Sequence, residues 1–240
     1  MTAALFLVPA MPDGDAYTLD GPEGHHAASV VRLRVGEALL LGDGRGGMAS
    51  AQVSAVGRGD VAVTIEKRWY VEPPSPRLVV AQGIPKGDRA ELAVQAMTEV
   101  GVDEIVPWAA ARCVVVWRGE RAAKARDKWA ATAREAAKQA RRPWVPAVAD
   151  SSVATAALAG RAAAVLVLDE DAATPLATVD LPSAGDIMLV VGPEGGITPD
   201  EVATLVDAGA TPVRIGPNVL RTSTAGVAAL SVLSARLGRW

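Results

Sequence analysis

Cysteine is almost absent from this chain of 240 residues. Cys113 is the single cysteine, so an internal disulfide is impossible and a disulfide-stabilised secreted protein is not expected. The N-terminus lacks the basic stretch of a signal peptide, and no apolar run reaches the roughly 18 residues of a membrane helix. We therefore expect a cytoplasmic protein without a membrane partner.

The sequence also has only two histidines and no net positive charge. The two histidines, His25 and His26, form no recognisable ligand set, so no metal is expected. The net charge of −3 argues against a strongly basic nucleic-acid binder. The stretch from Glu120 to Arg142, however, contains eight basic residues and only three acidic ones. This stretch fits either a solvated helix face or a surface that attracts phosphates.

The sequence has no phosphate-binding loop of the G-x-x-x-x-G-K-[ST] type. Residues Gly42–Gly47 formally match the dinucleotide fingerprint G-x-G-x-x-G. That fingerprint needs a helix directly after the glycines, because the helix N-terminus binds the pyrophosphate. Here Met48–Val56 has the pattern of a strand, which predicts a hairpin turn at these glycines.

Two halves of the chain show different patterns. Residues 1–71 contain short β-like runs separated by glycines, at Ala38–Leu41, Ala51–Val56 and Val61–Ile65, which predict a small antiparallel barrel. The next segment, residues 72–77, has three prolines and is expected to be a stiff linker between domains.

Residues 78–240 alternate between strand and helix patterns, and the strands are continuously apolar. Such strands are typical of a parallel sheet covered on both faces, so we expect an α/β domain. Strands are predicted at Leu78–Gln82, Glu104–Trp108, Ala164–Leu168, Ile187–Val191 and Val213–Ile215, and helices at Asp88–Val100, Glu120–Arg142, Pro199–Ala208 and Ser223–Leu237.

The first motif that suggests chemistry is Gly-Pro-Glu-Gly-Gly at residues 192–196, between an apolar strand and a helix with Thr198 as its N-cap. Glycines let a ligand approach the backbone, and open α/β sheets bind ligands at the carboxyl ends of their strands. A plain strand–helix connection is the alternative, although the embedded proline and glutamate make the motif more specific.

The second motif, Ile-Gly-Pro-Asn-Val-Leu-Arg-Thr-Ser-Thr-Ala at residues 215–225, has the same design. A strand ends in a glycine, a loop follows, and a helix begins with hydroxyl residues. Alone it fits an ordinary capped helix. Together, the two strand ends define one crevice at the edge of the sheet.

These two motifs resemble the ribosomal RNA small-subunit methyltransferase E family of the SPOUT class. The resemblance covers nearly the whole chain, because Lys86–Val102, Arg134–Pro143 and His25–Arg34 are also similar to family segments. It implies a PUA-like barrel before a SPOUT domain with a deep trefoil knot, and a homodimer with its active site at the subunit interface. The implied activity is methylation of uridine N3 in 16S ribosomal RNA of the small subunit by S-adenosylmethionine.

The resemblance also implies the cofactor-binding positions, which combine backbone groups of glycine turns with apolar side chains. They are Leu168, Gly192, Pro193, Glu194, Gly195, Gly196, Ile215, Gly216, Leu220, Arg221, Thr222 and Ala225. The chain departs from the family pattern at Ser223, where glutamate is usual, and before Phe6, where the family often has an arginine.

Two residues are candidates for catalysis. Uridine N3 must lose a proton, so a general base or a cation beside the uracil would help. Glu194 is the acidic candidate and Arg221 the cationic one, although Glu194 fits a carboxylate at a helix N-terminus equally well. Cys113 could be a nucleophile, but its apolar surroundings at residues 112–116 favour a buried strand residue.

The candidate RNA contacts are basic residues spread over both halves, namely Arg32, Arg34, Lys86, Arg112, Arg141 and Arg142. Trp117 and Trp144 could stack on unpaired bases, although buried packing is the commoner role of tryptophan. Two rival functions remain: a SPOUT methyltransferase that acts on a base or ribose of transfer RNA, and a non-catalytic RNA-binding or ribosome assembly factor.

Overall fold

The computed structural model describes residues 3–150 and 153–240. The chain divides into two compact units. The smaller unit contains Met1–Pro73 together with Ala137–Val145, and the larger one contains Pro74–Ala136 and Pro146–Trp240. The segment Ala137–Val145 lies in the range expected for the C-terminal domain, yet it groups with the N-terminal residues.

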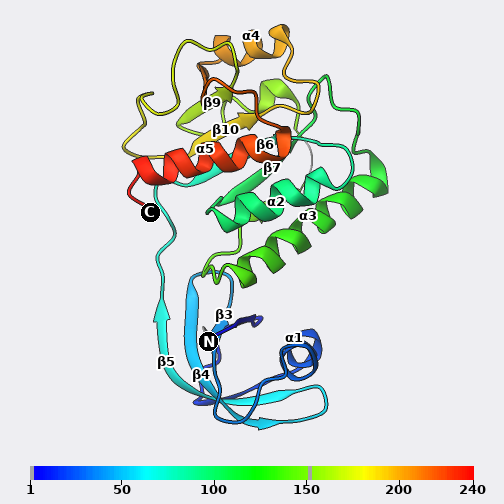
Figure 1. The fold of residues 1–240 in the computed structure, drawn as a ribbon, viewed down its shortest axis with the longest axis vertical. Helices are drawn as coiled ribbons and strands as arrows, with labels where there is room; N and C mark the ends of the chain where they lie inside the picture. The colour runs from blue at the N-terminus through cyan, green and yellow to red at the C-terminus, as the bar shows by residue number, and fades with distance from the viewer. Residues whose placement is uncertain (1–2, 151–152) are drawn as a thin grey trace. The chain divides into compact units, whose positions relative to one another are not determined.

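The smaller unit is built on a five-stranded sheet in the order β1-β3-β4-β5-β2 (Figure 1). Every neighbouring pair is antiparallel except β1 and β3, which are parallel. The three strands expected from sequence lie within β3, β4 and β5. The elements are β1 (Leu5–Leu7), β2 (Ala16–Leu19), α1 (Gly21–His25), a π-helix (His26–Val31), β3 (Ala38–Gly42), β4 (Gly47–Val56) and β5 (Val61–Tyr70).

The hairpin turn between β3 and β4 contains the glycines of the formal dinucleotide match, as predicted. Asp43 closes it, because one carboxylate oxygen accepts hydrogen bonds from the backbone N–H groups of Arg45 and Gly47. No helix follows, since Gly47 begins β4. The turn therefore lacks the helix N-terminus that a pyrophosphate site requires.

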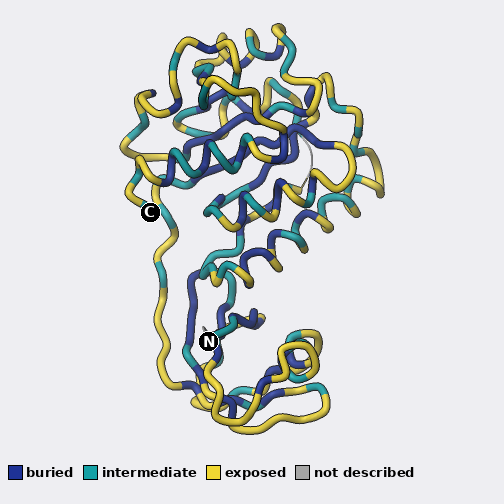
Figure 2. The backbone as a smooth tube through the Cα atoms, viewed as in Figure 1, coloured by how far each residue is buried: buried dark blue, intermediate teal, exposed yellow. Residues whose placement is uncertain are grey.

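The larger unit contains a six-stranded parallel sheet in the order β11-β9-β10-β6-β7-β8. Its central strands are buried along their length, which agrees with their unbroken apolar sequences (Figure 2). The strands are β6 (Leu78–Gly83), β7 (Glu104–Trp108), β8 (Ala147–Val148), β9 (Ala164–Leu168), β10 (Ile187–Val191) and β11 (Thr211–Val213).

Helices cover both faces of this sheet. On one face, alternate strand residues such as Leu78 and Leu189 pack with side chains of three helices, α2 (Arg89–Glu99), α3 (Gly119–Gln139) and α5 (Thr222–Arg236). On the other face, α4 (Pro199–Asp207) contributes Leu205 to a second core, beside a short 3₁₀ turn (Thr155–Ala157). The prediction of an α/β domain is confirmed.

Three local predictions were wrong. Residues 112–116 form no strand: Val114 and Val116 are 71% and 57% exposed, and the backbone N–H of Cys113 donates to Ala110 in a turn. The last strand is Thr211–Val213 rather than Val213–Ile215, so Ile215 lies in the loop that follows it. Helix α3 ends at Gln139, because Arg141 takes a left-handed conformation with φ 54°.

Candidate functional site

A cavity of about 1110 Å³ opens at the carboxyl ends of β9, β10 and β11. Every position that the sequence assigned to the cofactor pocket lines it, namely Leu168, Gly192, Pro193, Glu194, Gly195, Gly196, Ile215, Gly216, Leu220, Arg221, Thr222 and Ala225. The parallel strands explain this convergence, because they bring the ends of distant segments to one edge of the sheet.

The Gly-Pro-Glu-Gly-Gly turn after β10 forms one wall, and two of its glycines, Gly192 and Gly195, have little space for a side chain. A Cβ at Gly192 would lie 2.8 Å from Cγ1 of Ile197, and one at Gly195 would lie 3.0 Å from Cβ of Arg112. Gly196 has φ +74°, in the left-handed region that favours glycine. The turn is therefore specified by sterics and by backbone conformation, and all five of its residues line the cavity.

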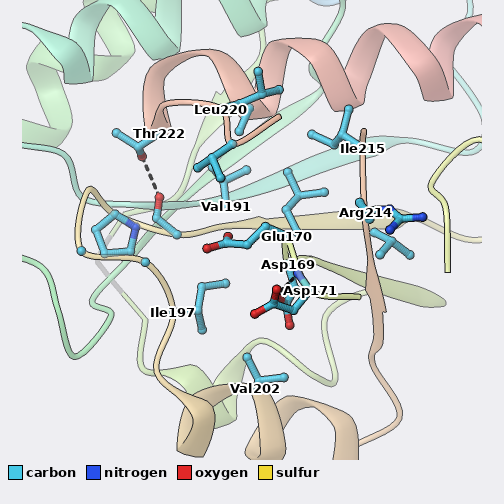
Figure 3. A pocket seen from close by; sticks show the side chains of 18 of the residues that line it. Asp169, Glu170, Asp171, Val191, Ile197, Val202, Arg214, Ile215, Leu220 and Thr222 are labelled. Atoms are coloured by element: carbon cyan, nitrogen blue, oxygen red, sulfur yellow. Dashed lines mark hydrogen bonds between the residues drawn. The ribbon is translucent and has the colours of Figure 1, made fainter. Parts of the chain in front are cut away.

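Thr222, the first residue of α5, fixes the second motif to the first. Its hydroxyl donates to the carbonyl of Gly192 at 2.7 Å (the dashed line in Figure 3) and accepts from the side-chain amide of Gln82 at 2.9 Å. Gln82 and Thr222 are both buried. This hydrogen-bonded chain connects the ends of β6 and β10 with the N-terminus of α5.

Apolar side chains line two sides of the cavity. In Figure 3, Ile215 and Leu220 lie on one side, and Ile197 and Val202 lie on the other. The backbone next to Ile215 is accessible, because a Cβ at Gly216 would meet nothing within 4 Å. A flat, partly apolar group such as a nucleobase fits between such surfaces.

Three acidic residues that the sequence interpretation missed, Asp169, Glu170 and Asp171, also line the cavity (Figure 3). They follow β9 directly, and Asp169 accepts a hydrogen bond from the backbone N–H of Asp171 at 3.0 Å. Their position after an apolar parallel strand was the signal that could have identified them, because that strand ends at the same edge as β10.

The carboxylate of Glu194 contacts the beginning of α2. Its Oε1 atom accepts from the backbone N–H of Lys86 at 3.0 Å and lies 3.7 Å from Nη1 of Arg89. The side chain is 25% exposed. Glu194 thus connects the glycine turn to the segment that leads into α2.

The other candidate residues at the cavity differ in exposure. Arg221 precedes α5 and is exposed, and none of residues 3–150 and 153–240 forms a hydrogen bond or ion pair with its side chain. Ser223 is 4% exposed. Cys113 is half-buried, and burial raises the pKa of its thiol, which reduces its nucleophilicity at neutral pH.

Glu201, which the sequence did not single out, supports the loop that carries Arg112. One carboxylate oxygen accepts from the backbone N–H of Ala111 and the hydroxyl of Thr155, and the other accepts from the N–H and hydroxyl of Thr198. Burial works against the charged form, but these hydrogen bonds outweigh it and lower the pKa of Glu201 below its ordinary value.

The candidate RNA contacts lie in different parts of the chain. Arg112 lines the cavity and donates to the carbonyl of Gly195 at 2.9 Å, and Lys86 adjoins Glu194 through its backbone. The other four belong to the smaller unit, namely Arg32, Arg34, Arg141 and Arg142. Of the two candidate stacking residues, Trp117 packs edge-on against Trp129 at 4.9 Å between ring centroids.

In the described part of the chain, no helix is long and apolar enough to cross a membrane. The same residues contain no group of three or more histidine, cysteine, aspartate or glutamate side chains arranged to hold a metal ion.

Comparison with known proteins identifies the family. Residues 72–234 match a family model described as an RNA methyltransferase domain, and residues 19–66 match one described as an RNA methyltransferase PUA domain. The ribosomal RNA small subunit methyltransferase E of Mycobacterium bovis is 47% identical over 248 residues, which cover 100% of this chain and 94% of the relative.

Two solved structures are similar over almost their whole length. The Neisseria gonorrhoeae ribosomal RNA small subunit methyltransferase E bound to S-adenosyl methionine has a TM-score of 0.86 at 29% identity, covering 98% of both chains. A putative methyltransferase of Legionella pneumophila with bound S-adenosylmethionine has a TM-score of 0.84 at 31% identity, covering 98% of this chain and 97% of that one. The chain therefore belongs to the ribosomal RNA small subunit methyltransferase E family of RNA methyltransferases.

Proposed function

We propose that this protein transfers a methyl group from S-adenosylmethionine to N3 of a uridine in 16S ribosomal RNA. The observation that carries the proposal is the single cavity into which both glycine-bearing motifs converge. Family membership supports the reaction class, and two relatives of similar fold hold the same cofactor. When bound, S-adenosylmethionine supplies an electrophilic methyl group attached to a sulfonium.

The residues present fit this cofactor. The open space at Gly216 leaves backbone groups accessible to a ligand, and Ile215 and Leu220 offer apolar contacts for an adenine ring. We propose that the carboxylates of Asp169 and Glu170 bind polar groups of the cofactor. A carboxylate accepts hydrogen bonds, and the ribose hydroxyls and the ammonium group of the cofactor can donate them. The cavity thus combines apolar walls with a few convergent polar groups.

We propose that Glu194 positions the glycine turn rather than removing the proton from uracil N3. Its Oε1 atom accepts from the N–H of Lys86 and lies next to Arg89, so the side chain is anchored to the segment that leads into α2. A general base must instead be directed at the proton that it takes. The contacts of Glu194 therefore favour the positioning role over the base role.

Arg221 is the residue to which we assign stabilisation of the uracil anion that forms when N3 loses its proton. It is exposed at the cavity, so an incoming base or phosphate can reach its guanidinium group. A guanidinium group keeps its positive charge at every physiological pH, and a fixed cation near a developing negative charge lowers the barrier.

The assignment to domains and partners follows the family. We propose a PUA-like RNA-binding domain at residues 1–71, a linker at 72–77 and a SPOUT domain at 78–240, acting as a homodimer in the cytoplasm without a metal. The family model over residues 19–66 supports the RNA-binding role. The trefoil knot stays a prediction.

Methylation of purified small subunits tests the function directly. Small subunits from a strain that lacks this gene are incubated with the protein and S-adenosylmethionine, and the modified nucleotides are mapped by mass spectrometry. We expect one methylated uridine in 16S RNA. A methyl group found on transfer RNA alone, or cofactor binding without any methyl transfer, would support one of the two rival functions instead.

Variants at the two candidate residues test their roles. For Glu194→Gln, positioning predicts weaker cofactor binding and a change in kcat below about tenfold, whereas loss of a general base predicts a fall of roughly 100-fold or more with binding intact. For Arg221→Gln we expect a fall in kcat of about 100-fold, as for other groups that stabilise charge in the transition state.

A further inference from the structure

An exposed aromatic pair stands out on the smaller unit. Tyr70 ends β5 and is 56% exposed, although it packs edge-on against Trp144 with 6.2 Å between the ring centroids. Trp144 is half-buried, and its indole N–H donates to the carbonyl of Val71 at 2.9 Å. The indole is therefore fixed, while more than half of the tyrosine surface faces solvent.

The hairpin turn between β3 and β4 holds this pair in place. The N–H of Gly46 donates to the carbonyl of Pro143, and a bridge pairs Arg45 with Trp144 in antiparallel fashion. Gly46 has φ +96°, and a Cβ there would lie 2.7 Å from the Tyr70 ring and 2.9 Å from the Trp144 ring. Both rings thus rest directly on the backbone of the turn.

Two exposed arginines lie close to Trp144, one through a backbone bridge and one along the chain. Arg45 and Trp144 are bridge partners, so their side chains project to the same side of the two paired backbone segments. Arg141 is three residues before Trp144, which places the two Cα atoms within about 11 Å. Across residues 3–150 and 153–240, no hydrogen bond or ion pair engages either arginine side chain, and both residues are exposed.

The backbone of Arg141 supplies an independent observation. The N–H groups of Arg142 and Arg141 donate to the carbonyls of Ala137 and Lys138, which closes α3 with a left-handed residue at Arg141, where φ is 54°. Glycine occupies this position at lower steric cost. This helix end fixes where the chain leaves α3 and leaves the exposed Arg141 three residues before Trp144.

We propose that Tyr70, Trp144, Arg45 and Arg141 form a binding site for an unpaired nucleotide of the RNA substrate, named here the tyrosine–arginine site. Tyr70 offers a ring face on which a base stacks, and the arginines neutralise the phosphates on either side of it. The site lies entirely within the smaller unit and rests on the proposed function, because that function makes RNA the ligand.

Fluorescence anisotropy with the full-length protein tests the site, using decauridylate and a transcript of small-subunit ribosomal RNA as probes. Tyr70→Ala should weaken binding of both about tenfold, the loss of one base stack, and Tyr70→Phe should bind like the wild type. Arg45→Gln should reduce the slope of log affinity against log salt concentration by about 0.7, the value for one phosphate contact to a single strand.

Trp69→Ala is the matched control. Trp69 precedes Tyr70 on β5, so its side chain projects to the opposite face, and it is 36% exposed. This variant should bind both RNAs like the wild type. Equal losses for Trp69→Ala and Tyr70→Ala would indicate a general effect on the unit and would overturn the proposal. Thermal unfolding of each variant shows whether the fold is intact.

Crosslinking provides a readout that needs no variant. A decamer containing 5-iodouridine is irradiated with the wild-type protein, and the crosslinked peptide is identified by mass spectrometry. We expect Tyr70 or Trp144, and crosslinks confined to other residues would contradict the site. Unchanged RNA affinity in Tyr70→Ala together with lost binding of a ribosomal protein would assign the surface to a protein partner instead.

The outcomes separate this site from the proposed function. If the wild-type protein methylates small subunits and Tyr70→Ala binds RNA equally well, the tyrosine–arginine site is wrong and the function stands. If the wild-type protein binds S-adenosylmethionine but neither binds nor methylates ribosomal RNA, the proposed function fails and the site fails with it.

Discussion

Two glycine-rich turns in this chain are similar in composition and different in surroundings. In the Gly42–Gly47 turn, other residues of the protein pack against the glycines, because Tyr70, Val71 and Trp144 cover the backbone of Gly46. At Gly192–Gly196 the turn lines a cavity of about 1110 Å³ at the end of a parallel sheet. Glycine permits close packing of protein atoms in both turns, with Ile197 and Arg112 in the second. Only the second turn also lines a cavity, where we propose that a ligand binds.

The element that follows each turn accounts for the difference. A strand follows Gly47 and pairs back onto the preceding strand, so the turn is a hairpin between neighbouring strands. After Gly196 the chain enters α4, with Thr198 and Glu201 in a reciprocal capping box. A helix leads the chain away from the strand ends and leaves space beside them. The pattern of glycines alone therefore does not identify a ligand site.

The largest expected effect is a loss of folding stability when the first turn, Gly42–Gly47, is altered. In Gly46→Ala, the added methyl group would lie 2.5 Å from the carbonyl oxygen of Val71, on a backbone with φ +96°. We expect the free energy of unfolding to fall by about 3 kcal/mol, with unchanged affinity for S-adenosylmethionine. Denaturant unfolding and calorimetry measure the two. Gly59→Ala, where a Cβ meets nothing within 4 Å, is the control and should unfold like the wild type.

The second effect should appear at the other turn as lost cofactor binding. Valine at Gly192 would collide with Ile197, because even a Cβ there lies 2.8 Å from its Cγ1 atom. For Gly192→Val we expect the affinity for S-adenosylmethionine to fall about 100-fold, or roughly 2.7 kcal/mol. Gly160→Val, at a position with open space around it, serves as the control in the same titration. Unchanged affinity in Gly192→Val would remove this turn from the cofactor site.

A third effect depends on pH, through Glu201. Because its folded-state pKa is lowered, its stabilising contribution is present above the unfolded-state pKa of about 4.3 and is lost as the pH falls through the folded-state pKa. Glu201→Gln should therefore cost about 2 kcal/mol at pH 7 and less in acid, when thermal unfolding is followed across pH.

Asp200→Asn is the control for this measurement. Asp200 lies in the same first turn of α4 and is exposed, so the loss of its charge should change stability little at any pH. A difference between wild type and Glu201→Gln that stays constant down to acid pH would show that the charge of Glu201 contributes nothing.

The smallest effect concerns the connection between the two motifs. Thr222→Val keeps the shape of the side chain but removes the hydroxyl that bridges Gly192 and Gln82. We expect a loss of about 1 kcal/mol in stability and a several-fold weaker affinity for S-adenosylmethionine, measured by calorimetry. Thr224→Val, on an exposed part of the same helix, should change neither. A wild-type affinity in Thr222→Val would show that the bridge does not shape the cavity.

Much of the larger unit followed from its sequence, for a physical reason. Strands β9 and β10 were predicted with their observed bounds, because buried parallel strands are unbroken apolar runs. The N-cap of α4 was also predicted, since Thr198 and Pro199 each have one favourable place at a helix start. Local chemistry alone determines such elements.

The incorrect or missed predictions concern segments whose structure depends on contacts between residues far apart in the sequence. The run Arg112–Val116 is apolar enough for a strand, yet no neighbour pairs with it, and the loop is held instead by Glu201 and Gly195. Both contacts join residues more than 80 positions apart, and no local pattern indicates them. The acidic residues after β9 were missed because their meaning depends on which strand ends lie side by side.

The smaller unit is discontinuous in the sequence, and this affects how the protein can be divided. A fragment ending at Pro73 would lack the segment that covers Gly46, and the hydrophobic cluster of Leu5, Leu7 and Met48 would lose its contact with Val145. An autonomous version of this unit must therefore supply residues 137–145 as a second piece or through a circular permutation. For the same reason, exchanging only residues 1–73 between relatives would pack them against residues 137–145 of a different protein, with which they have not evolved.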